Sequence, residues 1–189
     1  MADPRPPIES EGSIRSPSGP EPQAASPPAS PPRFIADPPL GKVARWLRAL
    51  GYDTLYLRRL EPSFLARALA EGRLLLTRSS RLAAQRAVRG RCLLLREELP
   101  AAQVREVLRR LGLGPSERAL RICMECNAPL QVVAKAEVAG MVPEFVFHHQ
   151  PRFFRCPHCR RVYWPGSHAE DMEQRMAALS PPSAPLAPA

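Results

Sequence analysis

Four cysteines in two closely spaced pairs constrain this chain more than any other feature of its sequence. The pairs are Cys123/Cys126 and Cys156/Cys159, with two residues inside each pair and 29 residues between the pairs. Two intervening residues allow a tight turn, or knuckle, that points both sulfurs at one ion, and two knuckles complete a tetrahedron. Four sulfurs fill every position around a metal, so the spacing predicts a structural rather than a catalytic site.

Two disulfides are the alternative for these cysteines, but disulfides belong to oxidising compartments. The first seven residues are followed by no apolar run of the kind that a signal peptide needs, and no apolar stretch is long enough to span a membrane. We therefore expect a cytoplasmic protein whose knuckles bind zinc, or less often an iron–sulfur centre. Because four sulfurs are available, we expect His158, inside the second knuckle, to point outward.

The prolines divide the chain into a folded part and two tails. Ten of the 24 prolines lie in residues 1–33, and four more lie in the last ten residues. Segments of this composition cannot bury enough apolar surface to fold. The expected parts are a disordered arm (1–32), a first module (33–117), a second, cysteine-containing module (118–172) and a C-terminal tail (173–189).

The positive charge of the chain is concentrated in the first module. The whole chain has a formal net charge of +9. Residues 34–117 hold 16 basic and eight acidic residues, a net +8, whereas residues 118–179 hold eight and six, a net +2. A basic module predicts a polyanionic partner, and nucleic acid is the leading candidate. A genomic bias is the alternative explanation, because 25 of the 27 basic residues are arginine.

Strand-like and helix-like segments alternate through the first module. Short apolar runs predict strands, and apolar residues at helical spacing predict the helices between them. The expected elements in chain order are a strand at 34–36, a helix at 43–50, a strand at 54–57, a helix at 62–71, a strand at 74–76, a helix at 80–89, a strand at 92–95 and a helix at 104–111. This alternation predicts an α/β layer fold with a small parallel sheet of about four strands.

The second module has the order of elements that is typical of a zinc ribbon. Residues 130–133 and 144–147, between the knuckles, are both strand-like, and 162–164 follows the second knuckle as a third strand. So small a domain has little core. We therefore expect the ion to supply much of its folding free energy.

Polar residues follow the expected strands, where a parallel sheet binds its ligands. Asp37 follows the first strand, Arg78 and Ser79 follow the third, and Glu61 opens the helix before the third. Carboxylates that converge at this edge would hold Mg²⁺ or Mn²⁺ for attack on a phosphodiester. Each acid or hydroxyl also has a simpler interpretation, because all three stand where a helix cap or a helix-start charge is favoured.

The folded region also resembles a known family. The matching segments are Phe34-Ile-Ala-Asp37, Leu40-Gly-Lys-Val-Ala-Arg-Trp-Leu-Arg48, Leu50-Gly-Tyr-Asp-Thr54, Glu71-Gly-Arg-Leu-Leu-Leu-Thr-Arg78 and Tyr163-Trp-Pro-Gly-Ser-His168. In this order and with both knuckles, the chain resembles the PIN-like ribonuclease family with an attached zinc ribbon, named after the C-terminal part of the Mut-seven exonuclease. The resemblance covers about residues 33–172.

The resemblance implies a metal-dependent ribonuclease with acids at the ends of the first and third strands. The first acid of the family matches Asp37. Family members usually have Asp where this chain has Glu61, and they read Thr-Arg-Asp where it has Thr77-Arg78-Ser79. The loss of one carboxylate weakens cation affinity directly. The acids that follow the fourth strand, Glu97 and Glu98, are the candidate replacements.

Three functions compete on these observations. The first is a Mg²⁺- or Mn²⁺-dependent ribonuclease, the second a non-catalytic RNA-binding module, and the third an interaction protein that recruits partners through the ribbon and the proline-rich arm. The predicted catalytic positions are Asp37, Glu61 and Ser79, and the predicted RNA-binding residues are Lys42, Arg45, Arg48 and Arg78. The arginine at 78 suits phosphate, whereas the serine at 79 argues against metal.

Overall fold

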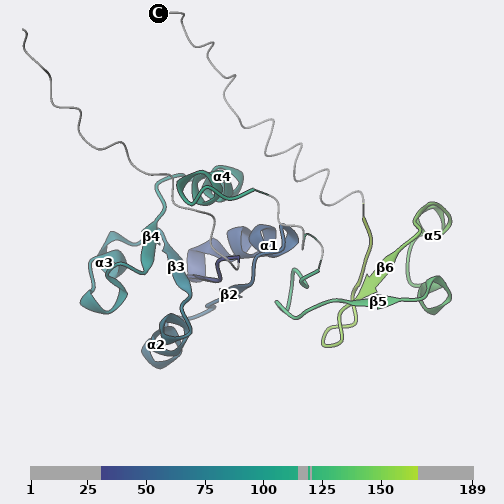
Figure 1. Ribbon diagram of the computed structural model, residues 1–189, viewed down its shortest axis with the longest axis horizontal. Helices are drawn as coiled ribbons and strands as arrows, with labels where there is room; N and C mark the ends of the chain where they lie inside the picture. Colours follow the sequence, from purple (N-terminus) through teal and green to yellow (C-terminus); the bar gives the residue numbers. More distant parts are fainter. Residues whose placement is uncertain (1–30, 115–118, 120, 166–189) are drawn as a thin grey trace, which may run out of the picture.

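The computed structural model describes residues 31–114, 119 and 121–165. These ranges leave out most of the two tails, the boundary between the modules near residue 117, and His168. Of the tails that we expect to be disordered, only residues 31 and 32 are described. Figure 1 shows the sheet of the first module on the left and the ribbon on the right. None of the described helices is long and apolar enough to cross a membrane.

A four-stranded parallel sheet forms the centre of the first module, as predicted. Its strands are β1 (Phe34–Ala36), β2 (Thr54–Tyr56), β3 (Leu74–Thr77) and β4 (Cys92–Leu94). They lie in the order β2-β1-β3-β4, and every neighbouring pair is parallel. The chain therefore changes direction across the sheet between β1 and β3, and the carboxyl ends of these two strands form the switch point where such sheets bind ligands.

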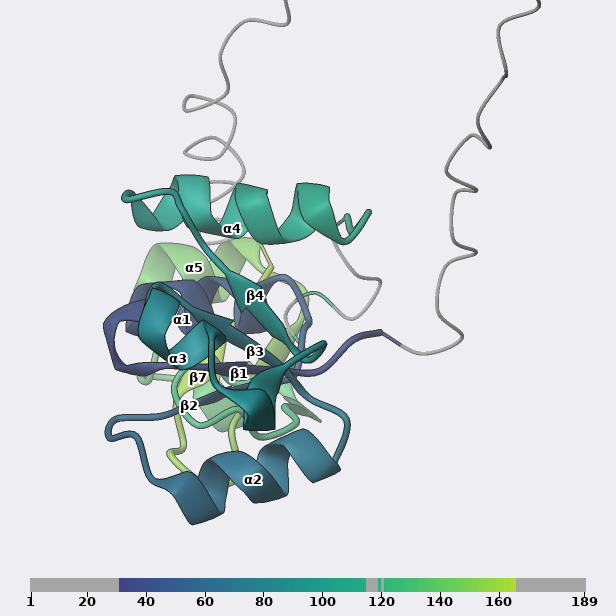
Figure 2. The same cartoon turned by 90° about the vertical axis from the view of Figure 1, so that its left-hand side faces the viewer.

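Helices cover both faces of this sheet. They are η1 (Pro38–Leu40), α1 (Gly41–Ala49), α2 (Pro62–Ala70), α3 (Ser80–Ala83), η2 (Arg86–Val88) and α4 (Pro100–Arg110). One buried cluster joins the sheet to α1 and α4, and a second joins it to α2 and α3. Figure 2 shows α4 on one side of the strands and α2 on the other.

The apolar strand sequences follow from burial on both faces. Ile35 and Leu75 belong to the cluster on the α2 side, whereas Phe34, Ala36 and Leu76 belong to the cluster on the α1 side. Successive side chains of a strand point to opposite faces, so a strand that is covered on both sides needs a continuous apolar run. All five side chains are fully buried.

The prediction of one helix over residues 80–89 was wrong. The chain leaves the helical conformation at Gln85, whose ψ is 138°, and forms the short α3 and η2 on either side of it. The buried contacts of this stretch come from Leu82 and Val88, which both pack into the α2-side cluster. These two anchors are six residues apart, and the break at Gln85 lets both reach the sheet.

The ribbon contains an antiparallel sheet of three short strands in the order β5-β6-β7. They are β5 (Gln131–Val133), β6 (Phe153–Arg155) and β7 (Val162–Tyr163), with η3 (Lys135–Val138) in the β5–β6 connection.

The prediction of a strand at 144–147 was wrong, because this segment belongs to α5 (Glu144–His149). Helical spacing stacks the Phe145 ring on His149, with 4.0 Å between ring centroids, while Phe145 itself remains 72% exposed. A strand there would have had no buried face for its aromatic side chains, and strand propensity depends on such a face.

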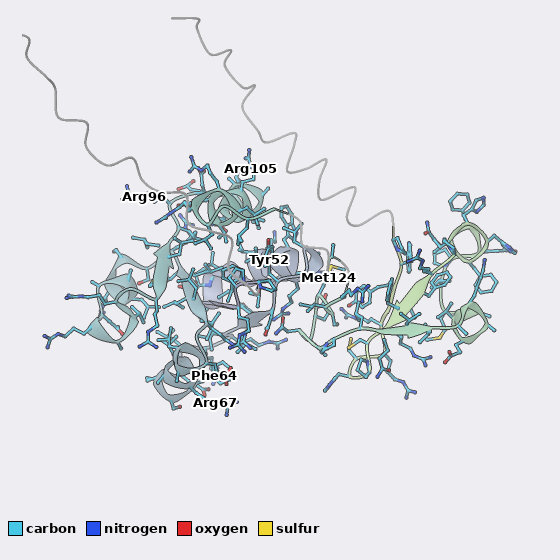
Figure 3. All side chains as sticks on the ribbon, viewed as in Figure 1. Tyr52, Phe64, Arg67, Arg96, Arg105 and Met124 are labelled. Carbon is cyan, nitrogen blue, oxygen red and sulfur yellow. The ribbon has the colours of Figure 1, made fainter. Side chains whose placement is uncertain are left out.

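The two modules share one hydrophobic core. Cys123, Met124 and Ala128, around the first knuckle, belong to the same buried cluster as the side chains of α1 and α4. Figure 3 labels Met124 at this junction, beside the first module. The ribbon is therefore docked on the first module rather than tethered to it.

Candidate metal and nucleic-acid sites

The four cysteines of the two knuckles converge on one point. Their sulfur atoms all lie within 4.8 Å of one another, and all four cysteines are free thiols. The Cys123 and Cys159 sulfurs are 3.6 Å apart. A tetrahedral zinc ion with Zn–S bonds of about 2.3 Å needs sulfurs about 3.8 Å apart, so the donors fit a four-thiolate zinc site. His158 is exposed and lies outside the group.

Hydrogen bonds to sulfur favour the thiolate form that a metal requires. The backbone N–H of Cys126 donates to the Cys123 sulfur (3.4 Å), and that of Cys159 donates to the Cys156 sulfur (3.5 Å). The Tyr163 hydroxyl lies 3.2 Å from the Cys123 sulfur. Burial raises the pKa of Cys123, but the Tyr163 hydroxyl and the knuckle N–H groups outweigh it and lower this pKa to about 7. Cys123 is thus favoured as a thiolate, whereas burial and the neighbouring cysteine thiols raise the pKa of Cys126 to about 12.

Arg48 has a different position from the one its predicted RNA-binding role requires. Its side chain is only 6% exposed, and its guanidinium donates to the carbonyl of Thr54 (2.8 Å) and to the carbonyls of Met124 and Glu125 (2.9 Å each). The guanidinium also interacts electrostatically with Cys123. Arg48 therefore fastens the first knuckle to α1 and β2, and only its small exposed part could contact a phosphate.

A second polar junction between the modules was missed by the sequence reasoning. Asn127 accepts a hydrogen bond from the backbone N–H of Thr54 (2.9 Å) and donates to the Asp53 carboxylate. The same carboxylate forms a two-pronged pair with Arg73, at 2.8 and 2.9 Å. Asn127 has a φ of 63°, a conformation that Asn tolerates better than most residues. An Asn directly after a knuckle was the available sequence signal.

Asp37 lies at the switch point of the sheet, at the end of β1. It is 3% exposed, and its Oδ2 accepts a hydrogen bond from the Thr77 hydroxyl, at the end of β3. Its side chain forms no capping hydrogen bond with the described residues; only its backbone carbonyl accepts, from the N–H of Leu40 at 3.0 Å. The interpretation of the Asp37 side chain as a helix cap therefore does not account for its position.

The other oxygen of the Asp37 carboxylate is unusual. Oδ1 is buried and has no hydrogen-bond partner among the described residues. Burial raises the pKa of Asp37, although the Thr77 hydroxyl and the backbone N–H and charge of Arg78 oppose the increase. A buried acceptor without a partner is expensive, and folded proteins keep few of them. An ionised Oδ1 here is a free ligand atom for a cation.

Ser79 acts as a helix cap, as its simpler interpretation predicted. Its hydroxyl accepts from the N–H of Leu82 (3.2 Å) at the start of α3. The backbone N–H of Ser79 donates to the Thr77 hydroxyl (3.0 Å), which in turn donates to Asp37. The Thr77 hydroxyl thus connects position 79 to the Asp37 carboxylate, and Arg78 between them is exposed.

The remaining predicted acids are exposed. Glu61 stands before α2 and makes no capping bond there. Glu98 lies 4.0 Å from the Arg78 guanidinium. The loop after β4 is organised instead by Glu106, a residue not singled out from the sequence, which is buried and accepts from the N–H groups of Arg96 (2.9 Å) and Glu97 (3.2 Å). In the described part of the chain, the acids form no group of three or more metal-binding side chains like that of the cysteines.

Basic side chains line the outer face of α1. Lys42 and Arg45 are exposed there, and together with Arg58 they line a hollow of about 260 Å³. The hollow adjoins the sheet edge, because the Tyr56 hydroxyl in its wall donates to the carbonyl of Pro38 (2.9 Å), the residue after Asp37. Of the four predicted RNA-binding residues, three are exposed: Lys42, Arg45 and Arg78.

Comparison with known proteins gives one match. The family model described as the Mut7-C RNAse domain matches residues 32–176, which is most of the chain and includes both the sheet module and the ribbon. Neither a curated protein nor a solved structure matches.

Proposed function

The chain belongs to the Mut7-C RNase domain family, and on that premise we propose that it is a divalent-metal-dependent ribonuclease that hydrolyses RNA at the carboxyl edge of its sheet. The single observation that carries the proposal is the Asp37 carboxylate, buried at the switch point with one oxygen held by Thr77 and the other free. An arrangement of this kind is costly for folding and useful for binding a cation.

The residues of this edge have separate roles in the proposed reaction. Asp37 would hold Mg²⁺ or Mn²⁺ through its free oxygen, with Glu61 as the second carboxylate. When bound, the ion supplies Lewis acidity toward the phosphodiester and a nucleophilic water. The Thr77 hydroxyl fixes the orientation of the Asp37 carboxylate. The cations of Lys42, Arg45 and Arg78 would position the phosphates of the RNA.

The test is cleavage of labelled single-stranded RNA by the purified protein, with Mn²⁺ or without it. We expect cleavage with Mn²⁺ and none in its absence, and we expect Asp37→Asn to abolish it. Glu144→Gln is the control, because it removes an exposed acid of α5, outside the proposed site. Cleavage that survives Asp37→Asn, or that Glu144→Gln reduces equally, would contradict the assignment of Asp37.

A non-catalytic RNA-binding module is the second candidate, and Ser79 favours it. The serine adds no charge to the edge, and its hydroxyl already caps α3. This candidate predicts RNA binding without Mn²⁺-dependent cleavage. In both cases the logarithm of the affinity should fall linearly with the logarithm of the salt concentration, by about 0.7 for each phosphate contact on a single strand.

A further inference from the structure

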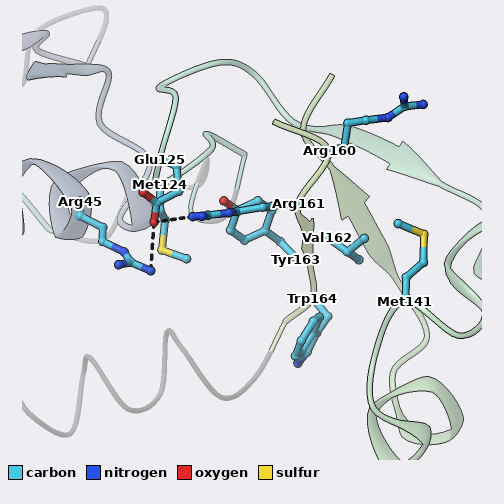
Figure 4. Close-up of a pocket in the computed structure, with 9 residues that line it drawn as sticks. All are labelled: Arg45, Met124, Glu125, Met141, Arg160, Arg161, Val162, Tyr163 and Trp164. Atoms are coloured by element: carbon cyan, nitrogen blue, oxygen red, sulfur yellow. Dashed lines mark ion pairs between the residues drawn. The ribbon is translucent and has the colours of Figure 1, made fainter. Parts of the chain in front are cut away.

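The ribbon side of the junction contains a hollow that the proposed reaction does not use. It has a volume of about 400 Å³ and lies between α1, the first knuckle and β7 (Figure 4). The side chains around it combine cations with a large aromatic ring and a thioether. They are Arg45, Met124, Glu125, Met141, Arg160, Arg161, Val162, Tyr163 and Trp164.

Two arginines face each other across one carboxylate in this hollow. Oε1 of Glu125 lies 3.1 Å from Arg45 and 2.9 Å from Arg161. The two arginine side chains nevertheless stay 54% and 59% exposed, so each guanidinium keeps donors that can reach a ligand. Two cations against one anion leave a net positive charge, and Glu125 fixes the directions of both side chains.

An aromatic ring lies beside these cations. Figure 4 shows the Trp164 ring in the open space below Arg161, whereas Arg160 points away from both. Trp164 is half-buried, so part of its ring can contact a ligand, and Met141 on the opposite wall is 54% exposed. A flat aromatic surface beside guanidinium groups is the combination that binds a base and its phosphate in single-stranded nucleic acid.

The hollow continues toward the sheet edge. It shares Arg45 and Glu125 with the hollow over α1 that Lys42 and Arg58 line. That second hollow shares Arg58 with a third, of about 330 Å³, which reaches Glu61. Through these shared walls, the neighbouring hollows form a track that runs from the ribbon past Lys42, Arg45 and Arg58 to Glu61.

We propose that the ribbon hollow is a subsite for one nucleotide of single-stranded RNA, with the base on Trp164 and a phosphate on Arg45 and Arg161. This inference rests on the proposed function for its choice of RNA as substrate. The ribbon would then take part in RNA recognition, whereas the charge distribution alone indicated only the basic first module. Because Glu125 lies within the first knuckle and Arg161 follows the second, the metal-binding turns position the subsite.

The fluorescence of Trp164 provides a direct test on the full-length, zinc-loaded protein without added Mg²⁺ or Mn²⁺. The chain has two tryptophans, and the other, Trp46, packs against the core. We expect an eight-residue oligouridylate to quench the fluorescence of the wild type and not that of Trp164→Phe. Uridine monophosphate should quench much less at the same concentration, because it cannot reach along the track.

Binding affinities test the energetic contribution of the subsite. Trp164→Ala should weaken binding of the oligouridylate by about 5- to 150-fold, the range for loss of one base–aromatic stack. Arg161→Ala should weaken it and reduce the salt slope by about 0.7. Arg109→Ala is the matched control, because it removes an exposed arginine from α4. Thermal unfolding of each variant must match the wild type, so that lost affinity reflects lost contacts.

The possible outcomes distinguish a failure of the subsite from a failure of the proposed nuclease activity. Unchanged affinity in Trp164→Ala and Arg161→Ala would overturn the subsite even if Mn²⁺-dependent cleavage is observed. Quenching by the mononucleotide as strong as by the oligonucleotide would also overturn it, in favour of a free-nucleotide site. Weakened binding in both variants, with Arg109→Ala binding like the wild type, supports the subsite even if no cleavage occurs.

Discussion

The guanidinium of Arg48, on α1, donates a hydrogen bond of 2.9 Å to the carbonyl of Met124, inside the first knuckle. This bond joins a residue of the sheet module to the turn that binds metal. The same side chain also holds the carbonyls of Thr54 and Glu125. Its buried charge faces a site that becomes negative when four thiolates bind one divalent ion. Arg48 therefore couples the folding of the ribbon to that of the sheet.

Arg48→Met should lower the free energy of unfolding by about 3 kcal/mol or more, because it leaves three buried carbonyls without their donor. Arg48→Lys should recover only part of this, since one ammonium cannot match the planar fork of a guanidinium. Urea unfolding measures the loss, and competition with a chelator measures the accompanying loss of zinc affinity. Arg45→Ala, one helical turn away, removes only an exposed ion pair and should cost less than about 1 kcal/mol. Equal losses in the Arg48 and Arg45 variants would contradict the coupling.

Freshly purified protein should contain one zinc ion per chain, and Cys156→Ser should lose it. Because Cys123 and Cys156 both lie in the core shared with α1 and α4, we expect zinc loss to expose amides of α1 as well as those of the ribbon. Elemental analysis and hydrogen exchange are the measurements. Ribbon amides that exchange while α1 stays fully protected would show that the two modules fold independently. Iron in place of zinc would identify the alternative metal centre.

Asn127→Ala should destabilise the protein by about 2–4 kcal/mol, because it removes both hydrogen bonds across the junction and places an alanine at a φ of 63°. Asn127→Gly loses the same hydrogen bonds but accepts the backbone conformation, so it should be the milder change. Thermal and urea unfolding of the two variants separate the two contributions. If the glycine variant is as stable as the wild type, the junction bonds contribute nothing.

The sequence predicted the elements whose signals are local. Cys-x-x-Cys spacing, apolar runs and helical periodicity correctly indicated the metal turns, the four parallel strands and helices α1, α2 and α4. The segment at 144–147 was misassigned because its aromatic, β-branched composition favours a strand only where a sheet covers one face. The local helical contact between Phe145 and His149 prevails there instead.

Long-range contacts were the part that local patterns could not predict. An arginine at helical position 48 looks like any surface cation in the sequence, and its burial depends on a knuckle more than 70 residues later in the chain. The network of Asp53, Arg73 and Asn127 likewise joins three separate segments. At the candidate catalytic edge, the sequence located Asp37 but gave no indication of its unpartnered oxygen.

Asp37→Asn should leave the protein at least as stable as the wild type at neutral pH. Burial raises the pKa of Asp37, against the hydrogen bond from Thr77 and the influence of Arg78. An acid with a raised pKa binds its proton more tightly in the folded state, so it stabilises the fold at low pH and loses that contribution as pH rises through the folded pKa. The stability advantage of Asp37→Asn over the wild type should therefore shrink as pH falls toward the ordinary aspartate pKa of about 3.9.

Urea unfolding between pH 4 and pH 8 measures the difference in stability between Asp37→Asn and the wild type. Thermal unfolding with added Mn²⁺ is a second test. A cation that binds Asp37 should raise the melting temperature of the wild type and not that of Asp37→Asn. If Asp37→Asn loses stability relative to the wild type as the pH rises from 4 to 7, the ionised carboxylate stabilises the fold. Asp37 would then be a structural residue.

Ser79→Asp should raise Mn²⁺ affinity and Mn²⁺-dependent RNA cleavage. Position 79 is connected to Asp37 through the Thr77 hydroxyl, so a carboxylate there adds negative charge near the Asp37 carboxylate. Aspartate and asparagine cap helices about as well as serine, and α3 should stay intact in both variants. Ser79→Asn is therefore the matched control, since it differs from Ser79→Asp only in charge.

Isothermal titration with Mn²⁺ and the cleavage assay compare the aspartate and asparagine variants. The gain in affinity and cleavage should appear with Mn²⁺ before Mg²⁺, which demands stricter geometry. Adding Asp37→Asn to Ser79→Asp should remove the gain. Equal Mn²⁺ affinity in the aspartate and asparagine variants would mean that position 79 only caps α3, and the non-catalytic RNA-binding module would become the better description of this chain.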